Sequence, residues 1–151
     1  MTAPDPRSLE QRIADTRARL DTEVDSWLPS ASADGEAFLI PISQYWDGER
    51  LWFATAIGSR TERNLRRVGS ARLGLGETRD VVMVEGTVDF YDPASVKEAT
   101  AAAYAAHCDW DPRNPAGRNV YFTITPVTIQ AWREANELAG RVIMREGRWL
   151  A

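Results

Sequence analysis

The stretch 48–67 restricts the possible folds of this chain more than any other segment. It contains an apolar run, 51–55, a break at Gly58, and then a strongly charged segment. Ser59 and Glu62 have the S-x-x-E spacing of a capping box, so the sequence predicts a helix with Ser59 as its N-cap. A strand, a glycine break and a short capped helix are therefore expected in direct succession.

The predicted helix carries a dense run of arginines behind its cap: Arg60, Arg63, Arg66 and Arg67. Helical spacing places Arg60, Arg63 and Arg67 on one face. A helix N-terminus presents unpaired N–H groups and the positive end of the dipole, and a neighbouring guanidinium adds to its attraction for anions. Two interpretations stay open from these residues alone: an anion-binding site, and a surface helix with a solvated basic face.

Several other segments have the period-two alternation of strands. The runs 38–46 and 51–55 are joined by Asp47-Gly48, the strongest short-range signal for a hairpin. Pro41 lies inside the first run and lacks an N–H donor, which indicates an edge position or a bulge. Further strands are expected over the following segments: 71–75, 82–90, 120–125 and 127–131. Gly86 allows the second of these to bend sharply, as small barrels require.

Helices are expected from Ser8 to about Asp25 and through the alanine-rich region 99–106, the latter capped by Asp92-Pro93. Residues 1–7 contain two prolines and little that is apolar, so we predict a flexible arm there, followed by one domain over 8–151. Several antiparallel strands with a few helices predict a mainly β protein, a small barrel with flanking helices.

Composition argues against several classes of function. The formal net charge of −4 disfavours nucleic-acid binding, which needs a basic surface. One histidine and one cysteine, His107 and Cys108, cannot form a metal site or an intrachain disulfide. No apolar run of membrane-spanning length and no signal-peptide pattern occur, so we expect a cytoplasmic protein without a membrane partner. Glu85 and Asp89 share one strand face and are interpreted as solvated, so no catalytic side chain is assigned.

The hairpin and the basic helix together suggest a more specific site. A barrel strand that ends at Thr55, followed by a capped basic helix, would hold a phosphate at the barrel mouth. A planar ring attached to that phosphate would lie along the strand 38–46. Most of the six tryptophans are expected in the core, although Trp46, Trp52 and Trp132 lie where a ring could stack on a flat ligand. This geometry fits a flavin nucleotide.

The chain resembles the pyridoxamine 5'-phosphate oxidase-like split-barrel family, and within it the actinobacterial flavin and deazaflavin oxidoreductases. The resemblance covers most of the chain from Trp27 onward, and it rests on the order and spacing of several short motifs rather than on any single one. The motifs are Trp27-Leu28, Pro41, Trp46–Thr55, Ser59–Arg67, Val84–Val88, Trp132-Arg133 and Met144–Trp149.

The resemblance implies a split β-barrel of the FMN-binding type that forms a homodimer, with a cofactor site at the subunit interface. It implies that Ser59 and Arg60 hold the cofactor phosphate, with Thr55 and Asn64 nearby. The strand around Ile42 would run beside the ring system, and Trp132 is the candidate contact from the partner subunit. Thr61 stands where many members have a lysine, so phosphate binding would lack one cation there.

The resemblance thus implies an oxidoreductase that uses FMN or coenzyme F-420 and acts on a small organic substrate. Two alternatives remain at this stage. The protein could carry a flavin or a haem-like ligand without turnover, a reading that Thr61 slightly favours. A dimeric scaffold without any cofactor is a weaker alternative.

Overall fold

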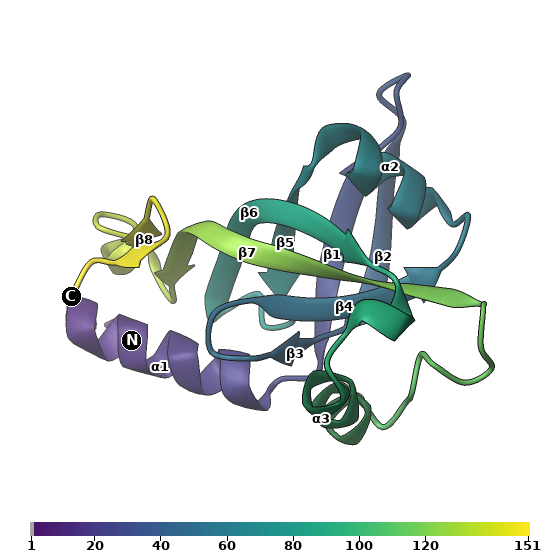
Figure 1. Ribbon diagram of the computed structural model, residues 1–151. Coiled ribbons are helices and arrows are strands. Elements are labelled where there is room, and N and C mark those ends of the chain that lie inside the picture. Colours follow the sequence, from purple (N-terminus) through teal and green to yellow (C-terminus); the bar gives the residue numbers. More distant parts are fainter. Residues whose placement is uncertain (1) are drawn as a thin grey trace.

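Figure 1 shows a computed structural model of the protein, which describes residues 2–151. Within these residues nine strands form one curled antiparallel sheet in the order β2-β1-β5-β6-β7-β4-β3, with β8 paired to β7 and β9 to β8. The strands are β1 (Asp25–Ala31), β2 (Ala37–Ser43), β3 (Tyr45–Trp46), β4 (Leu51–Ala56), β5 (Ser70–Leu75), β6 (Val81–Tyr91), β7 (Asn119–Trp132), β8 (Val142–Arg145) and β9 (Arg148–Trp149).

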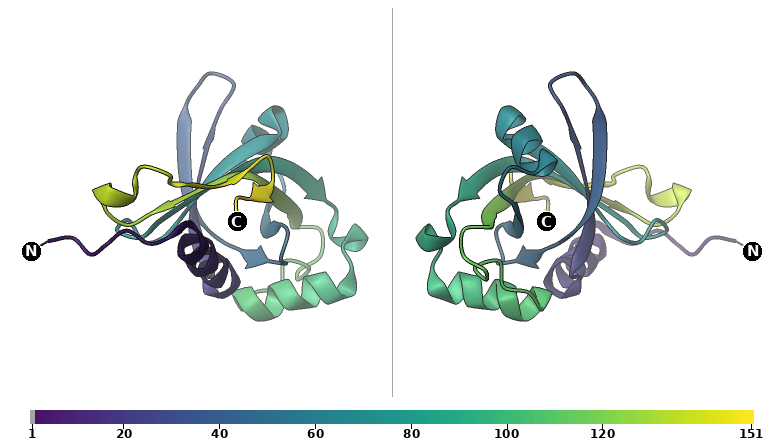
Figure 2. Two further views of the ribbon diagram at one scale, coloured as in Figure 1. Left: turned by 90° about the vertical axis from the view of Figure 1, so that its left-hand side faces the viewer. Right: turned by 90° about the vertical axis from the view of Figure 1, so that its right-hand side faces the viewer.

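Three α-helices lie around this sheet (Figure 2): α1 (Leu9–Thr22), α2 (Arg60–Val68) and α3 (Glu98–Cys108). Two short 3-10 turns are η1 (Pro93–Ser95) and η2 (Ala135–Glu137). The helix predicted from Ser8 to about Asp25 is confirmed, with Ser8 as its N-cap, but it ends at Thr22 and Asp25 already begins β1. The predicted cap of the alanine-rich helix is wrong, because the Asp92 side chain caps η1 and α3 begins only at Glu98. Across residues 2–151, no helix combines the length and the apolar character needed to cross a membrane.

The predicted hairpin is only partly correct. The run 38–46 is not one strand, because β2 pairs with β1 over its whole length while only β3 pairs with β4. Gln44 separates the two pieces, and its N–H donates to the Val24 carbonyl 2.7 Å away. Pro41 lies on β2 at one end of the sheet order, which confirms the predicted edge position.

β6 and β7 form the longest strand pair of the sheet and bend together. β7 continues through Pro126, so the two strands predicted on either side of that proline are one. The register shifts between Glu85 and Gly86, and Gly86 lies opposite Pro126. A Cβ atom at Gly86 would lie 2.2 Å from the Thr125 carbonyl oxygen, so only glycine fits at this point of the strand pair. The predicted role of Gly86 in bending the strand is confirmed.

Apolar side chains fill the inside of the curled sheet. Leu28, Leu51, Phe53, Leu73 and Ile124 are among its fully buried members, and α1 adds Ile13 and Leu20. A second, smaller cluster packs under α3 around Trp52, Tyr104 and Tyr121. The expectation that most tryptophans are core residues is wrong. Only Trp46 and Trp52 are buried, whereas Trp27 is 48% and Trp110 42% exposed.

The predicted flexible arm, residues 1–7, includes Met1, which lies outside the described residues. The remainder of the arm has no helix or strand. Its last residue, Arg7, is fixed to η2, because the guanidinium and the backbone N–H both donate to the Glu137 carboxylate. The Pro4 carbonyl accepts a hydrogen bond from Asn136 at 2.8 Å.

Candidate anion-binding site

The predicted N-cap of α2 is confirmed. The Ser59 hydroxyl accepts from the Glu62 N–H at 3.1 Å, and it also lies 2.8 Å from the Thr55 hydroxyl at the end of β4. The Glu62 carboxylate accepts from the Gly58 N–H at 2.7 Å, one residue before the cap. These bonds fix the direction in which the helix leaves the barrel strand.

Side chains of α2 attach the helix to the hairpin formed by β1 and β2. Arg67 Nη2 donates to the carbonyl oxygens of Ala31 and Ser32, at 2.9 and 3.2 Å. Asn64 Nδ2 donates to the Ser30 hydroxyl at 3.0 Å. The tip of the hairpin therefore lies along the basic face of α2.

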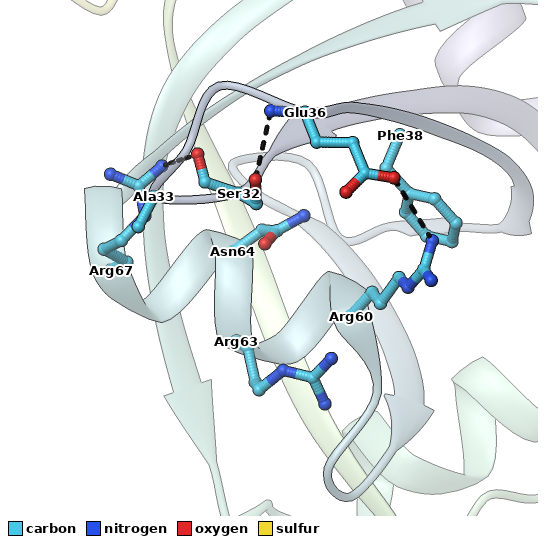
Figure 3. Close-up of a pocket in the computed structure, with 8 residues that line it drawn as sticks. All are labelled: Ser32, Ala33, Glu36, Phe38, Arg60, Arg63, Asn64 and Arg67. Atoms are coloured by element: carbon cyan, nitrogen blue, oxygen red, sulfur yellow. Dashed lines mark hydrogen bonds and ion pairs between the residues drawn. The ribbon is translucent and has the colours of Figure 1, made fainter.

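A cavity of about 340 Å³ lies between the hairpin and the helix (Figure 3). It is lined by Ser32, Ala33, Glu36 and Phe38 from the hairpin and by Arg60, Arg63, Asn64 and Arg67 from α2. The prediction that three arginines share one side of the helix is thus confirmed. All three line the cavity.

The charges that line the cavity are unbalanced. Glu36 is the one carboxylate among the lining residues, and its Oε1 lies 4.0 Å from Arg60 Nη1. Both side chains are largely exposed, so this pair is weak. Within residues 2–151 neither Arg63 nor Arg67 forms an ion pair. Three guanidinium groups against one carboxylate favour an anionic ligand.

One aromatic ring contributes to the cavity. The Arg60 guanidinium lies over the Phe38 ring, with its Cζ 5.5 Å from the ring centroid. This contact orients Arg60 across the cavity toward β2 (Figure 3). In the described part of the chain, no three His, Cys, Asp or Glu side chains are grouped to hold a metal ion. The cavity thus combines positive charge with a flat apolar surface.

The structure brings some of the sequence-predicted site residues together and separates others. Arg60 and Asn64 line the cavity, and Ser59 and Thr55 lie at the base of the helix. Thr61 does not line the cavity, because its side chain points into the molecule and is 2% exposed.

Ile42 and Trp132 lie away from this cavity within one chain. Ile42 shares a face of β2 with Phe38, and it packs against the main core. Trp132 ends β7 and pairs with Val81, whereas the start of β7 pairs with the end of β4 near α2.

Ser32, Glu36 and Phe38 were not identified as site residues from the sequence. The residues Ala33-Asp34-Gly35 are typical of a chain reversal, but such a turn does not indicate which element the reversed chain contacts. That contact depends on the length of the two strands before and after the turn, and on the bonds from Arg67 and Asn64.

Comparison with known proteins supplies a family. Residues 15–133 match the family model described as pyridoxamine 5'-phosphate oxidase, which is well over half of the chain. A comparison with curated proteins gives no match. Solved structures with the same fold are numerous, and all three described below are less than a quarter identical, so they bear on the fold alone.

An F420 reductase is 19% identical, with a TM-score of 0.62 over 75% of this chain and 94% of that one. A putative pyridoxamine 5'-phosphate oxidase from Listeria innocua is 18% identical, with a TM-score of 0.66 over 84% of this chain and 100% of that one. General stress protein 26 from Bacillus anthracis is 16% identical, with a TM-score of 0.61 over 80% and 93%. The predicted split-barrel fold is confirmed.

Proposed function

Because the chain belongs to the pyridoxamine 5'-phosphate oxidase family, we propose that it binds a flavin nucleotide, FMN, or the deazaflavin coenzyme F-420. We propose further that it acts as an oxidoreductase on a small organic substrate. The observation that carries the proposal is the cavity between α2 and the β1–β2 hairpin, whose lining contains three arginines and one carboxylate. Proteins of this family commonly hold flavins, whose phosphate needs such a site.

The phosphate would bind at the start of α2. Arg60 supplies a guanidinium there, and Ser59 and Thr55 supply hydroxyl groups held 2.8 Å apart. Phe38 lines the cavity, and Ile42 follows on the same face of β2, so a planar ring that lies on Phe38 would run along this strand toward Ile42. The bound cofactor would supply the hydride chemistry, and the chain would supply orientation and charge, so no protein acid or base is required.

The choice between FMN and F-420 depends on how far the anionic part of the ligand extends. Arg63 and Arg67 continue the positive surface along α2 beyond Arg60. A cofactor with a longer phosphate-linked tail would contact all three arginines, whereas FMN would need only the first. A similar fold is found in an F420 reductase.

We propose that the protein is a homodimer and that each cofactor site includes residues of the partner subunit. The outer face of β1 and β2 is apolar and exposed, with Trp27 at 48% and Leu39 at 58%. Trp27 pairs with Gly74 of β5, which pairs with the exposed Met83 of β6, so the apolar face continues across the sheet. An exposed apolar face of this kind is typical of subunit interfaces.

Trp132 lies on the same side of the sheet as this apolar face. Met83 pairs with Gln130 and Val81 pairs with Trp132, so Trp132 follows Gln130 on the outward side of β7. A second copy docked on this face would therefore meet Trp132, which supports its proposed role as a contact between subunits.

Replacement of Arg60 by alanine tests the site. A charge-assisted hydrogen bond is worth about 1.5–3 kcal/mol, so Arg60→Ala should weaken FMN or F-420 binding by roughly ten- to a hundredfold in calorimetry. Arg66→Ala is the matched control, because Arg66 lies on the same helix but pairs with Glu62 and stacks on Phe90. Equal affinities of the two variants would show that the phosphate binds elsewhere.

Absorbance spectroscopy separates an enzyme from a carrier. A bound flavin that is reduced by a nicotinamide or by F-420 and then reoxidised by a substrate supports the oxidoreductase. A cofactor or haem-like ligand that binds but is never turned over would support the alternative of a carrier protein. If no ligand binds at all, the remaining alternative is a dimeric scaffold without a cofactor.

A further inference from the structure

A second cavity lies at the opposite side of the molecule from α2. It has a volume of about 490 Å³, within the range of small-molecule sites. It is lined by Leu9 and Arg12 of α1, by Leu138, Gly140, Arg141, Val142 and Arg145 around β8, and by Leu150. Figure 1 shows the first turn of α1 beside β8 and the end of the chain, well away from α2.

The walls of this cavity are mostly apolar. Leu9 and Val142 form part of them, and Leu138 and Leu150 remain 40% and 42% exposed. Large aliphatic side chains left in contact with water at a concave surface are available to bury an apolar ligand.

The polar side chains that line the cavity are all cationic. Arg12 is 8% exposed, and its Nη1 donates to the carbonyl oxygens of Glu137 and Gly140, at 3.4 and 2.7 Å. Its buried Nε has no hydrogen-bond acceptor among residues 2–151. In the same part of the chain, no carboxylate forms an ion pair with Arg12, Arg141 or Arg145.

A buried guanidinium without a counter-charge is costly, because the backbone carbonyls that accept its hydrogen bonds carry no net charge. Arg7, a few residues earlier, shows the usual solution, because it pairs with the buried carboxylate of Glu137. Arg12 has no such partner. A carboxylate brought in by a ligand would supply the missing charge beside the guanidinium of Arg12, which lines the cavity.

We propose that this cavity binds a small amphiphilic carboxylate. Its carboxylate would bind at the guanidinium groups of Arg12 and Arg145, and its apolar body would lie against Leu138 and Leu150. This site goes beyond the proposed cofactor site and does not depend on it, because no residue lines both cavities.

Octanoate, kept below the concentration at which it forms micelles, is the probe, and 1-octanol is its uncharged counterpart. Calorimetry on the full chain should show octanoate binding more tightly than octanol by at least about tenfold, since only the acid makes charge-assisted hydrogen bonds. Raising the salt concentration should weaken octanoate binding and leave octanol binding unaffected. Equal affinities of the two probes, or no binding of octanoate, would overturn the proposal.

Two variants test the residues without removing the buried arginine, whose loss could unfold the protein. Arg145→Gln should weaken octanoate binding by about tenfold. Arg148→Gln, in the adjacent strand β9 but outside the lining, is the matched control and should bind like the wild type. Leu138→Glu places a carboxylate in the cavity and should therefore abolish octanoate binding. The urea midpoint should stay unchanged, because Leu138 is 40% exposed.

Equal losses in Arg145→Gln and Arg148→Gln would contradict specific recognition of the acid. A different occupant would also be revealed by these measurements. If octanoate does not bind and Leu138→Glu converts an oligomer to a monomer in light scattering, a second copy of the chain covers the groove and the proposal is wrong.

Discussion

Among single residues, Glu137 has the most complete set of partners for a buried charge. It is 2% exposed, and it accepts from the Arg7 N–H, Nε and Nη2 at 2.9, 3.0 and 2.8 Å. The Arg133 N–H donates to it at 2.8 Å as well. The hydrogen bonds from the Arg7 side chain are the main cause that lowers the pKa of Glu137 from 4.5 to about 2, against an opposing effect of burial.

This pKa shift predicts a loss of stability in acid. The folded-state pKa lies below the unfolded value, so the stabilisation is fully present above pH 4.5 and is lost as the pH falls toward about 2. It amounts to about 3 kcal/mol in the free energy of unfolding. Urea unfolding of the wild type at a series of pH values should show this loss. Glu137→Gln should be destabilised at neutral pH, with a flatter acid profile.

Glu77→Gln, at an exposed position between β5 and β6, is the control for a general charge effect. Its acid profile should match that of the wild type. The same acid slope in Glu137→Gln as in the wild type would show that another carboxylate causes the loss.

At the scale of elements, an irregularity in the antiparallel pairing of β6 with β7 marks the place where these two strands bend. The two strands pair from Val81 to Tyr91, but a register shift next to Gly86 divides the pairing into two parts. The β7 backbone passes so close to Gly86 that a side chain has no space there.

Gly86→Ala should therefore destabilise the protein by about 3 kcal/mol or more, because the added Cβ meets backbone atoms rather than a movable side chain. Gly76→Ala is the matched control, since a Cβ there has no neighbouring atom within 4 Å. Its effect should be near zero or slightly stabilising. Urea midpoints measure both, and equal midpoints would show that the strands can separate at no cost.

At the scale of the whole molecule, the most prominent feature is an apolar outer face on the β2-β1-β5-β6 part of the sheet. Trp27, Leu39 and Met83 are exposed on it, although the opposite side of the same strands is packed in the core. Pro41 on the edge strand β2 lacks an N–H donor, which disfavours pairing of this edge with a strand of another copy. Docking of a second copy is therefore favoured on the apolar face rather than at the edge.

Trp27→Glu and Leu39→Glu should each convert the proposed dimer to a monomer, because a charge would be buried at its centre. Ile57→Glu is the control, since Ile57 is equally exposed, at 57%, but lies beyond the end of β4. Sedimentation equilibrium measures the mass. A wild-type monomer, or dissociation by Ile57→Glu alone, would contradict the proposed face. If the site is shared, the monomeric variants should also lose cofactor affinity.

The sequence alone predicts those structural features that depend on residues only a few positions apart. The Ser59 cap is a bond to Glu62, three residues on, so spacing alone predicted it. The edge position of Pro41 follows from its missing donor, and the bend at Gly86 from its missing side chain. The basic face of α2 follows from helical periodicity. The split-barrel fold was implied by the resemblance to a known family, which rests on the order of several short motifs along the chain.

Other features were decided only by tertiary structure, because they depend on partners far away in the chain. The run 38–46 divides into β2 and β3 because β1 pairs with its first part, a choice that alternation cannot reveal. Glu36 and Phe38 reach the cavity only because the hairpin is long enough to lie along α2. Thr61 is buried rather than beside the arginines, since the sheet packs under that face of the helix. Periodicity defines which residues share a face, but packing decides what that face contacts.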